Sequence, residues 1–307
     1  MAPLLYLSLL LLLSAGVHSE LNLAEEEEGG LSHVREGDWD LGPEDDDGDY
    51  SYEDASMDFK AGSIEELVVA HAPFLRFHKT EGENDFCFPH DATDYYNTRV
   101  SEDWSRQCNM NYSTLHGEIP TYWHAQACGE HLHIAYWTFT GYNHKCDLIS
   151  GERDAWWEFI VVKVRNWETA PFMAEVMFGQ KEGWYTRVPG RYDVIEHTHP
   201  VAFVGHASHG FYHDDGGSNS CCYFEDLRNP GLSDTFMRTH LNLVELKDDG
   251  TGEEWMTDPS VHYWSGILAP TYRDNWDLCR LLGCTGSYLQ ICGTCGCHKS
   301  DIGGDPF

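Results

Sequence analysis

Four short runs of aromatic and β-branched residues constrain the fold of this sequence more than any other feature. They cover residues 131–139, 156–164, 173–178 and 201–204. Such side chains favour extended backbone, and the Gly, Asn and Asp clusters between the runs are typical of a sandwich or a barrel. Ser63, followed three residues later by Glu66, predicts the capped start of a helix. The sequence therefore predicts a mainly β protein, a β-sandwich with short peripheral helices and a disulfide-rich C-terminal cap.

The regions on either side of the predicted sandwich, which we place at residues 61–276, differ from it in composition. Residues 1–19 hold an apolar run followed by small residues, which is typical of a cleavable signal peptide and too short for a membrane-spanning helix. Residues 20–60 carry 16 acidic residues against two basic ones, so we expect a disordered acidic leader. Residues 277–307 contain five cysteines and predict the cap. No later segment is long and apolar enough to span a membrane, and we expect a secreted, extracellular protein.

The cysteine count indicates disulfide bonds rather than a zinc site, because exported chains are oxidised. The sequence has eleven cysteines, an odd number. At most five bridges can form within one chain, so one thiol stays free or pairs with a second chain. The pairing itself cannot be deduced from the sequence.

The formal net charge of −32 limits the classes of partner. A chain this acidic is repelled by phosphate backbones and by anionic membranes, which argues against a nucleic-acid ligand. Cations, basic proteins and neutral glycans remain as candidates.

Two kinds of modification site are predicted. Asn111 begins an Asn-Tyr-Ser glycosylation sequon in a polar segment. Tyr50 and Tyr52 lie among acidic residues of the leader, a setting in which secreted tyrosines are often sulfated. The alternative for the leader is a plain solvated spacer or a propeptide.

A candidate metal site begins with the acidic residues before the second apolar run. On a strand, Asp154, Trp156 and Glu158 would share a face, with Glu152 joining them if the strand begins early. Carboxylates on one face suit Ca²⁺, Mg²⁺ or Mn²⁺. The alternative is an edge strand whose acids face water.

The segment 205–217 is dense in imidazole, hydroxyl and carboxylate groups. His206, His209 and His213 could supply metal ligands or a general base, and we place His206 and His209 in the candidate metal site. Tyr212, His213 and Asp214 are candidate ligand-binding residues, together with Trp156, whose ring could stack on a sugar.

Two His-x-His patterns, at His131/His133 and at His197/His199, would each project to one side of a strand and suit a transition metal, as in a jelly-roll oxygenase. The motifs of serine hydrolases, zinc proteases and phosphate-binding loops are missing from the sequence.

Four segments resemble, in the same order, motifs of the vacuolar protein sorting-associated family that is related to necrosis-inducing proteins. The segment 151–158 is similar to the family's "GDHEGDWE" without a gap. The other three are residues 71–89, 133–143 and 201–212. The acidic leader and the cysteine-rich tail fall outside the resemblance.

The resemblance implies a β-sandwich with a divalent cation at one end and, in the cytolytic branch, polar lipid or sphingolipid headgroups as ligands. Of the octapeptide, Gly151, Trp157 and Glu158 are identical to the family, whereas Arg153 replaces a His and Trp156 replaces the central Asp. These departures put the cation site and cytolytic activity in doubt.

Together these features predict a secreted β-sandwich that binds a glycan or polar lipid headgroup near a divalent-cation site. A metal-dependent hydrolase or oxygenase that uses the His-rich loop is the first alternative. An acidic extracellular-matrix or structural protein is the second.

Overall fold

The computed structural model describes residues 62–281, except for residues 85, 102–105, 145–152, 181–182, 207, 216–226 and 232–234. The predicted signal peptide, the acidic leader with Tyr50 and Tyr52, Glu152, and residues 282–307 of the predicted cap lie outside the described residues.

The larger of two sheets in the described part of the chain has six strands in the order β11-β2-β3-β4-β5-β6. Neighbours are antiparallel except for the parallel pair of β11 and β2. The strands are β2 (Thr121–Cys128), β3 (His131–Asn143), β4 (Arg153–Arg165), β5 (Phe172–Gln180), β6 (Gly183–Arg187) and β11 (Leu243–Glu245).

The smaller sheet has the order β10-β1-β8-β7, and β9 also pairs with β8. β1 runs parallel to β8, and the other pairs are antiparallel. The strands are β1 (Phe74–Arg76), β7 (Val194–Ile195), β8 (His199–Val204), β9 (Phe211–Tyr212) and β10 (Phe236–Arg238).

Helices are short. The first, α1 (Ile64–Ala70), begins with the predicted capping box between Ser63 and Glu66. α2 (Ala92–Val100) is capped by Asp91. The 3₁₀ turns are η1 (Tyr112–Leu115), η2 (Thr239–Leu241), η3 (Glu254–Thr257), η4 (Pro270–Tyr272), η5 (Asp274–Trp276) and η6 (Leu278–Arg280). Among the described residues, no helix combines the length and the apolar character that crossing a membrane requires.

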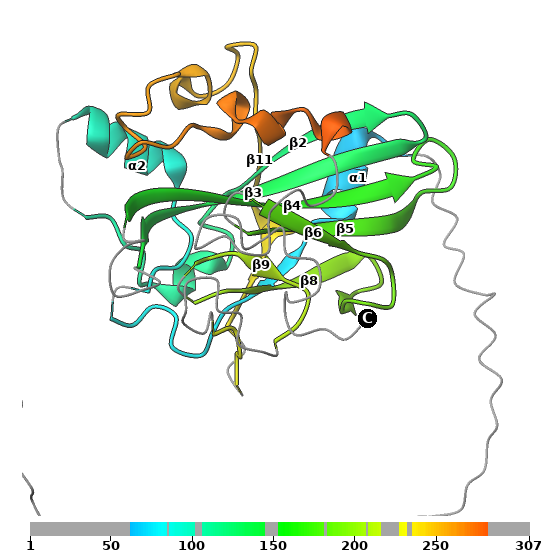
Figure 1. The fold of residues 1–307 in the computed structure, drawn as a ribbon, viewed down its shortest axis with the longest axis horizontal. Coiled ribbons are helices and arrows are strands. Elements are labelled where there is room, and N and C mark those ends of the chain that lie inside the picture. The colour runs from blue at the N-terminus through cyan, green and yellow to red at the C-terminus, as the bar shows by residue number, and fades with distance from the viewer. Residues whose placement is uncertain are drawn as a thin grey trace, which may run out of the picture. The chain divides into compact units, whose positions relative to one another are not determined.

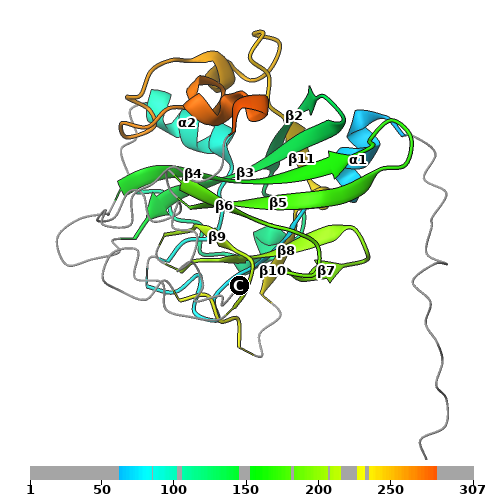
Figure 2. The same cartoon turned by 45° about the vertical axis from the view of Figure 1, so that its right-hand side comes forward.

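The six-stranded sheet is covered on both faces (Figures 1 and 2). The five-stranded sheet lies against one face, and α2 lies on the other with residues 246–281, which we call the C-terminal cover. The apolar run of β4 is continuous because both faces of the strand are buried. Ile160 and Val162 enter the core between the two sheets. Trp157 and Phe159 enter a second core, between the six-stranded sheet and the C-terminal cover, which we call the outer core. A strand buried on both faces carries apolar residues without alternation. The predicted β-sandwich is confirmed.

The described residues contain two disulfide bonds. Cys87 is bonded to Cys108, and Cys128 at the end of β2 is bonded to Cys279 in the cover. The other seven cysteines lie outside the described residues, so the prediction about the odd cysteine stays a prediction.

Candidate functional site

The acidic residues of β4 do not share one face. Glu158 is two residues before the inward-facing Ile160 on β4, so both belong to the same side of the strand. The Trp156 Nε1–H donates a 2.6 Å hydrogen bond to Glu158 Oε1. Glu158 is only 1% exposed, so this contact offsets part of the cost of burying a carboxylate. Trp156 is 5% exposed, and the guanidinium of Arg153 lies over its ring at 4.7 Å from the ring centre, so this ring is not a free stacking surface.

Asp154 instead lies with α2 on the outer side of the sheet. Its carboxylate is 3.0 Å from the guanidinium of Arg99, which stacks over the ring of Tyr95 in the outer core. The prediction that Asp154 shares a face with Glu158 is wrong because Ala155 has a φ of 65°. That left-handed residue breaks the alternation of side chains along the strand.

The two candidate histidines of the loop after β8 gather around a carboxylate that the sequence did not single out. His209 Nε2 lies 3.4 Å from Glu81 Oε1, and His206 Nε2 lies 3.8 Å from Glu81 Oε2. The Glu81 side chain is fully buried. His206 also contacts Thr80 Oγ1 at 3.2 Å and stacks on the ring of Phe86. Only the fold brings Glu81 beside residues more than 120 positions away in the chain.

His209 is held rigidly by protein groups. Its backbone is left-handed, with a φ of 57°, a conformation that His tolerates better than most residues. Nδ1 lies 2.7 Å from Asn143 Oδ1 at the end of β3, and Nε2 lies 2.9 Å from the Cys87 carbonyl oxygen. Both ring nitrogens are therefore engaged, which does not suit a metal ligand.

The candidate metal ligands thus separate into different surroundings. Asp154 pairs with Arg99, Glu158 with Trp156, and the two histidines surround Glu81. Within the described ranges, no group of three or more His, Cys, Asp or Glu residues is placed to hold a metal ion.

A polar pocket of about 430 Å³ lies beside β8 and β9, where the chain between β6 and β7 folds over them. His213 and Asp214, two of the predicted ligand-binding residues, line it, whereas Trp156 and Tyr212 do not. Tyr212 is buried in the core. The guanidinium carbon of Arg228 lies over the Tyr212 ring, 4.1 Å from the ring centre. The lining residues are Arg76, Gly190, Arg191, Tyr192, Asp193, Phe203, His213, Asp214 and Asp215.

A buried hydrogen-bond network fixes the wall of the polar pocket. The backbone N–H of His213 donates to the Tyr185 hydroxyl oxygen at 3.0 Å, and His213 Nδ1 lies 2.8 Å from the same hydroxyl. Burial raises the pKa of Tyr185, so the phenol keeps its proton and can donate it to Nδ1. On the other side of the ring, His213 Nε2 lies 3.2 Å from Asp214 Oδ2.

Arg228 completes this network from the opposite side. Its side chain is fully buried, and its Nη2 donates to Asp214 Oδ1 at 2.7 Å while its Nε donates to the Asp214 carbonyl oxygen at 2.8 Å. Charge-assisted bonds of this kind are short and strong. Asp214 is therefore neutralised by Arg228, and Arg191, Asp193 and Asp215 remain as the exposed charges of the pocket.

The His-x-His pairs do not form an oxygenase site in the described residues. His133 on β3 contacts the Leu278 carbonyl oxygen of the cover through Nδ1 at 3.0 Å. The expected strand pair at His197 and His199 is wrong, because His197 is an exposed turn residue with a φ of 70°. His199 is buried and donates to the Ala72 carbonyl oxygen at 2.7 Å.

Comparison with known proteins finds no protein-family model that matches and no curated protein that matches. Solved structures of necrosis-inducing proteins do match. NLPPya in complex with mannosamine is 14% identical, with 51% of this chain and 70% of that chain covered and a TM-score of 0.37. The Necrosis and Ethylene inducing Protein 2 from the causal agent of cocoa's witches' broom disease is 15% identical, with 66% and 84% covered and a TM-score of 0.41. The non-toxic HaNLP3 protein is 13% identical, with 53% and 72% covered and a TM-score of 0.33.

These neighbours belong to the necrosis-inducing branch of the resemblance described above. Nothing found supports the vacuolar protein sorting-associated branch. TM-scores of 0.33 to 0.41 assign neither a ligand nor an activity to this chain.

Proposed function

We propose that this protein is a secreted β-sandwich that binds a glycan or a polar lipid headgroup in the polar pocket. The observation that carries the proposal is the pocket's mixed lining, in which guanidinium and carboxylate groups stand beside the rings of Tyr192 and Phe203. Sites for small polar ligands combine a hollow of this size with a few fixed polar groups and apolar walls.

Two residues of the pocket wall, His213 and Asp214, are held in place by buried neighbours. Asp214 and His213 are held by Arg228 and Tyr185, so their polar atoms do not have to be ordered when a ligand binds. Preorganised polar groups of this kind increase affinity because less conformational entropy is lost on binding. Arg191 and Asp193, which are exposed, would form the outer contacts with ligand hydroxyl or ionic groups.

Secretion and glycosylation belong to the same proposal. Two disulfides among the described residues suit an oxidising compartment. Asn111 is exposed before η1, and its Oδ1 accepts a hydrogen bond from Ser113 Oγ at 2.9 Å, so the sequon is open to a glycosyltransferase.

The test of ligand binding is a double substitution at the pocket rim, Arg191→Ala with Asp193→Ala. We expect at least a tenfold loss of affinity, because hydrogen bonds to charged groups contribute about 1.5–3 kcal/mol each. Isothermal titration against neutral glycans, phosphocholine, glucosamine and mannosamine measures it, the last two being the sugars in complexes of NLPPya.

The matched control is Glu245→Ala with Lys247→Ala, an exposed ion pair on and after β11, at the other edge of the six-stranded sheet from β6. It should bind like the wild type. Equal affinity of the rim variant and this control for every ligand that binds would contradict the proposal.

A divalent cation stays a separate proposal, with Glu158 as its ligand. Asp154 and His209 do not fit as ligands, since Arg99 and Asn143 engage them, which leaves Glu158 as the buried carboxylate of the predicted ligand set. We expect a chelator to lower the melting temperature of the wild type by several degrees and to have no effect on Glu158→Gln.

Asp154→Asn is the control for the cation test, because this variant should keep the response to chelator. The measurement is thermal melting with and without chelator, together with elemental analysis of the secreted protein. A wild-type melt that ignores the chelator, in a protein without bound metal, would remove the cation from the proposed function.

A further inference from the structure

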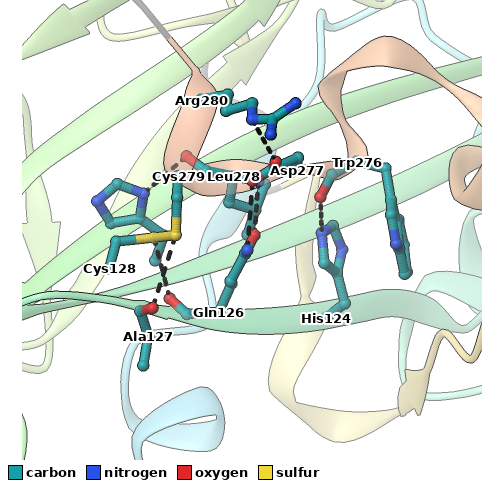
Figure 3. Close-up of a disulfide and its surroundings, with 10 residues drawn as sticks. His124, Gln126, Ala127, Cys128, Trp276, Asp277, Leu278, Cys279 and Arg280 are labelled. Carbon is teal, nitrogen blue, oxygen red and sulfur yellow. Dashed lines mark hydrogen bonds and ion pairs between the residues drawn. A yellow bond between two sulfur atoms is a disulfide. The ribbon is translucent and has the colours of Figure 1, made fainter.

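The last described residues of the chain, 276–281, form a short segment that we call the strap. The strap lies across the outer side of β2 and β3. Figure 3 shows the strap joined to the end of β2 by the disulfide between Cys128 and Cys279. The two cysteines are 151 residues apart in the sequence. Among the described residues, this bond links the end of the cover covalently to the sheet.

Polar side chains of β2 and β3 align the strap. The Leu278 N–H donates to Gln126 Oε1 at 2.8 Å, and the Gln126 Nε2–H donates to Asp277 Oδ1 at 3.2 Å (Figure 3). His133, the partner of Gln126 in the strand register, donates to the Leu278 carbonyl oxygen. The Leu278 side chain is fully buried beneath these contacts.

His124 makes the next contact along the strap. Its Nε2–H donates to the Trp276 carbonyl oxygen at 3.1 Å, and its ring stacks on the Trp276 indole with centroids 3.8 Å apart (Figure 3). Its Nδ1 accepts a hydrogen bond from Trp137 Nε1 at 3.3 Å. The strap therefore covers a polar and aromatic row on the sheet.

The two disulfides differ in access. Cys279 is exposed and Cys128 is half-buried, whereas Cys87 is fully buried and Cys108 is half-buried. Thiol–disulfide exchange requires a thiolate to reach one sulfur of the bond, so its rate depends on access. An external thiol therefore meets the Cys128–Cys279 bond first.

The rest of the cover is held without this disulfide. Trp255 Nε1 donates to Thr93 Oγ1 at 3.0 Å, and the Tyr96 hydroxyl donates to Asp258 Oδ2 at 2.7 Å. Arg273 Nη1 donates to the Trp157 carbonyl oxygen at 3.1 Å. Loss of the disulfide should therefore free the strap while the remainder of the cover stays packed on the outer core.

We propose that Cys128–Cys279 is a reducible site that controls whether the strap covers β2 and β3. A thiolate of an external dithiol attacks the sulfur of the exposed residue Cys279, forms a mixed disulfide with it and releases Cys128 as a thiolate, which takes up a proton. The second thiol of the reagent then attacks its own sulfur in the mixed disulfide and releases Cys279. The dithiol is oxidised to a cyclic disulfide, the protein bond gains two electrons, and the row of His124, Gln126 and His133 becomes accessible.

The test is stepwise reduction of the full-length native protein with dithiothreitol, followed by alkylation and peptide mass spectrometry. Cys128 and Cys279 should be alkylated at least tenfold faster than Cys87 and Cys108. Hydrogen exchange measured on the same samples should show the Leu278 amide losing protection, while peptides that contain Trp255 and Trp264 stay protected. Equal alkylation rates for the two disulfides would overturn the proposal.

The variant Cys279→Ser separates the strap from general effects of the reagent. It should show fast exchange at Leu278 without dithiothreitol and no further change when the reagent is added. Glu245→Ala with Lys247→Ala, which leaves the disulfide intact, should behave like the wild type. A protected Leu278 amide in Cys279→Ser would mean that hydrogen bonds alone hold the strap, and the proposal would fail.

Discussion

Replacement of Trp157 by alanine is expected to lower the free energy of unfolding by about 3–5 kcal/mol, the range for removing a large aromatic side chain from a core. Trp157 is fully buried on β4, and its ring contacts two rings of the sheet side, Tyr122 and Phe139, and two of the cover, Trp255 and Trp264. The centroid distances run from 4.9 to 5.8 Å, within the range of favourable aromatic pairs. The substitution therefore removes part of the aromatic contact between the cover and the sheet.

Trp157→Phe is the informative partner of this variant. Among the described residues the Trp157 Nε1–H is buried without a hydrogen-bond acceptor, so phenylalanine removes an unpaired polar group as well as part of the ring. We expect a clearly smaller loss for Trp157→Phe than for Trp157→Ala. Urea unfolding followed by circular dichroism, with the disulfides intact, measures both.

Phe172→Ala provides the control for burial. Phe172 is the first residue of β5 in the same sheet, but its side chain is 48% exposed. Substitutions of exposed residues usually change the free energy of unfolding by no more than about 0.5 kcal/mol. If Trp157→Ala cost no more than Phe172→Ala, the outer aromatic core would not be what holds the cover.

Four of the eleven strands in the described residues, β3, β4, β5 and β8, were predictable because burial leaves a local signature. Each apolar run of the sequence lies inside an observed strand, and the capping box at Ser63 begins α1 as expected. Both signals depend on residues that are close in the chain. The disulfide between Cys128 and Cys279 carries no such signature, since only the fold brings together cysteines 151 residues apart.

The candidate site was predicted less well, for three physical reasons. Asp154 was misplaced because one left-handed residue, Ala155, redirects it, and alanine rarely adopts that conformation. Glu81 was missed because its histidine neighbours are distant in the sequence. Arg191 and Asp193 were missed because isolated charges in a loop look like ordinary solvated residues, whereas His213 and Asp214 stood out in their dense segment.

Acid is expected to destabilise the fold through two buried histidines, His71 and His124. Burial, which penalises the charged ring, is the main cause that lowers the pKa of each to about 4 from an ordinary value of 6.5. His71 donates to the Thr198 carbonyl oxygen and lies near His199, while His124 lies between Trp276, Trp137 and Asp248. Both rings are therefore neutral in the native protein above pH 4.

The sign of the effect follows from these two pKa values. The unfolded chain takes up protons at these histidines from about pH 6.5 downward, whereas the native protein does so only near pH 4. The stabilisation is thus complete above pH 6.5 and is lost as the pH falls toward 4. A difference of about 2.5 pH units corresponds to roughly 3 kcal/mol for each histidine.

The measurement is the free energy of unfolding in urea at pH values from 8 to 4 for the wild type, His71→Gln and His124→Gln. Each glutamine is neutral throughout, so each variant should lose less stability than the wild type over this range, by roughly 3 kcal/mol, even where it is less stable at pH 8. His197→Gln, at the exposed turn before β8, should keep the wild-type dependence. Parallel curves for all four proteins would show that the acid sensitivity comes from groups other than His71 and His124. Because His124 contacts the strap, acid should also increase hydrogen exchange at the Leu278 amide before global unfolding. The pH response and the reduction of Cys128–Cys279 would then act on the same face of β2 and β3.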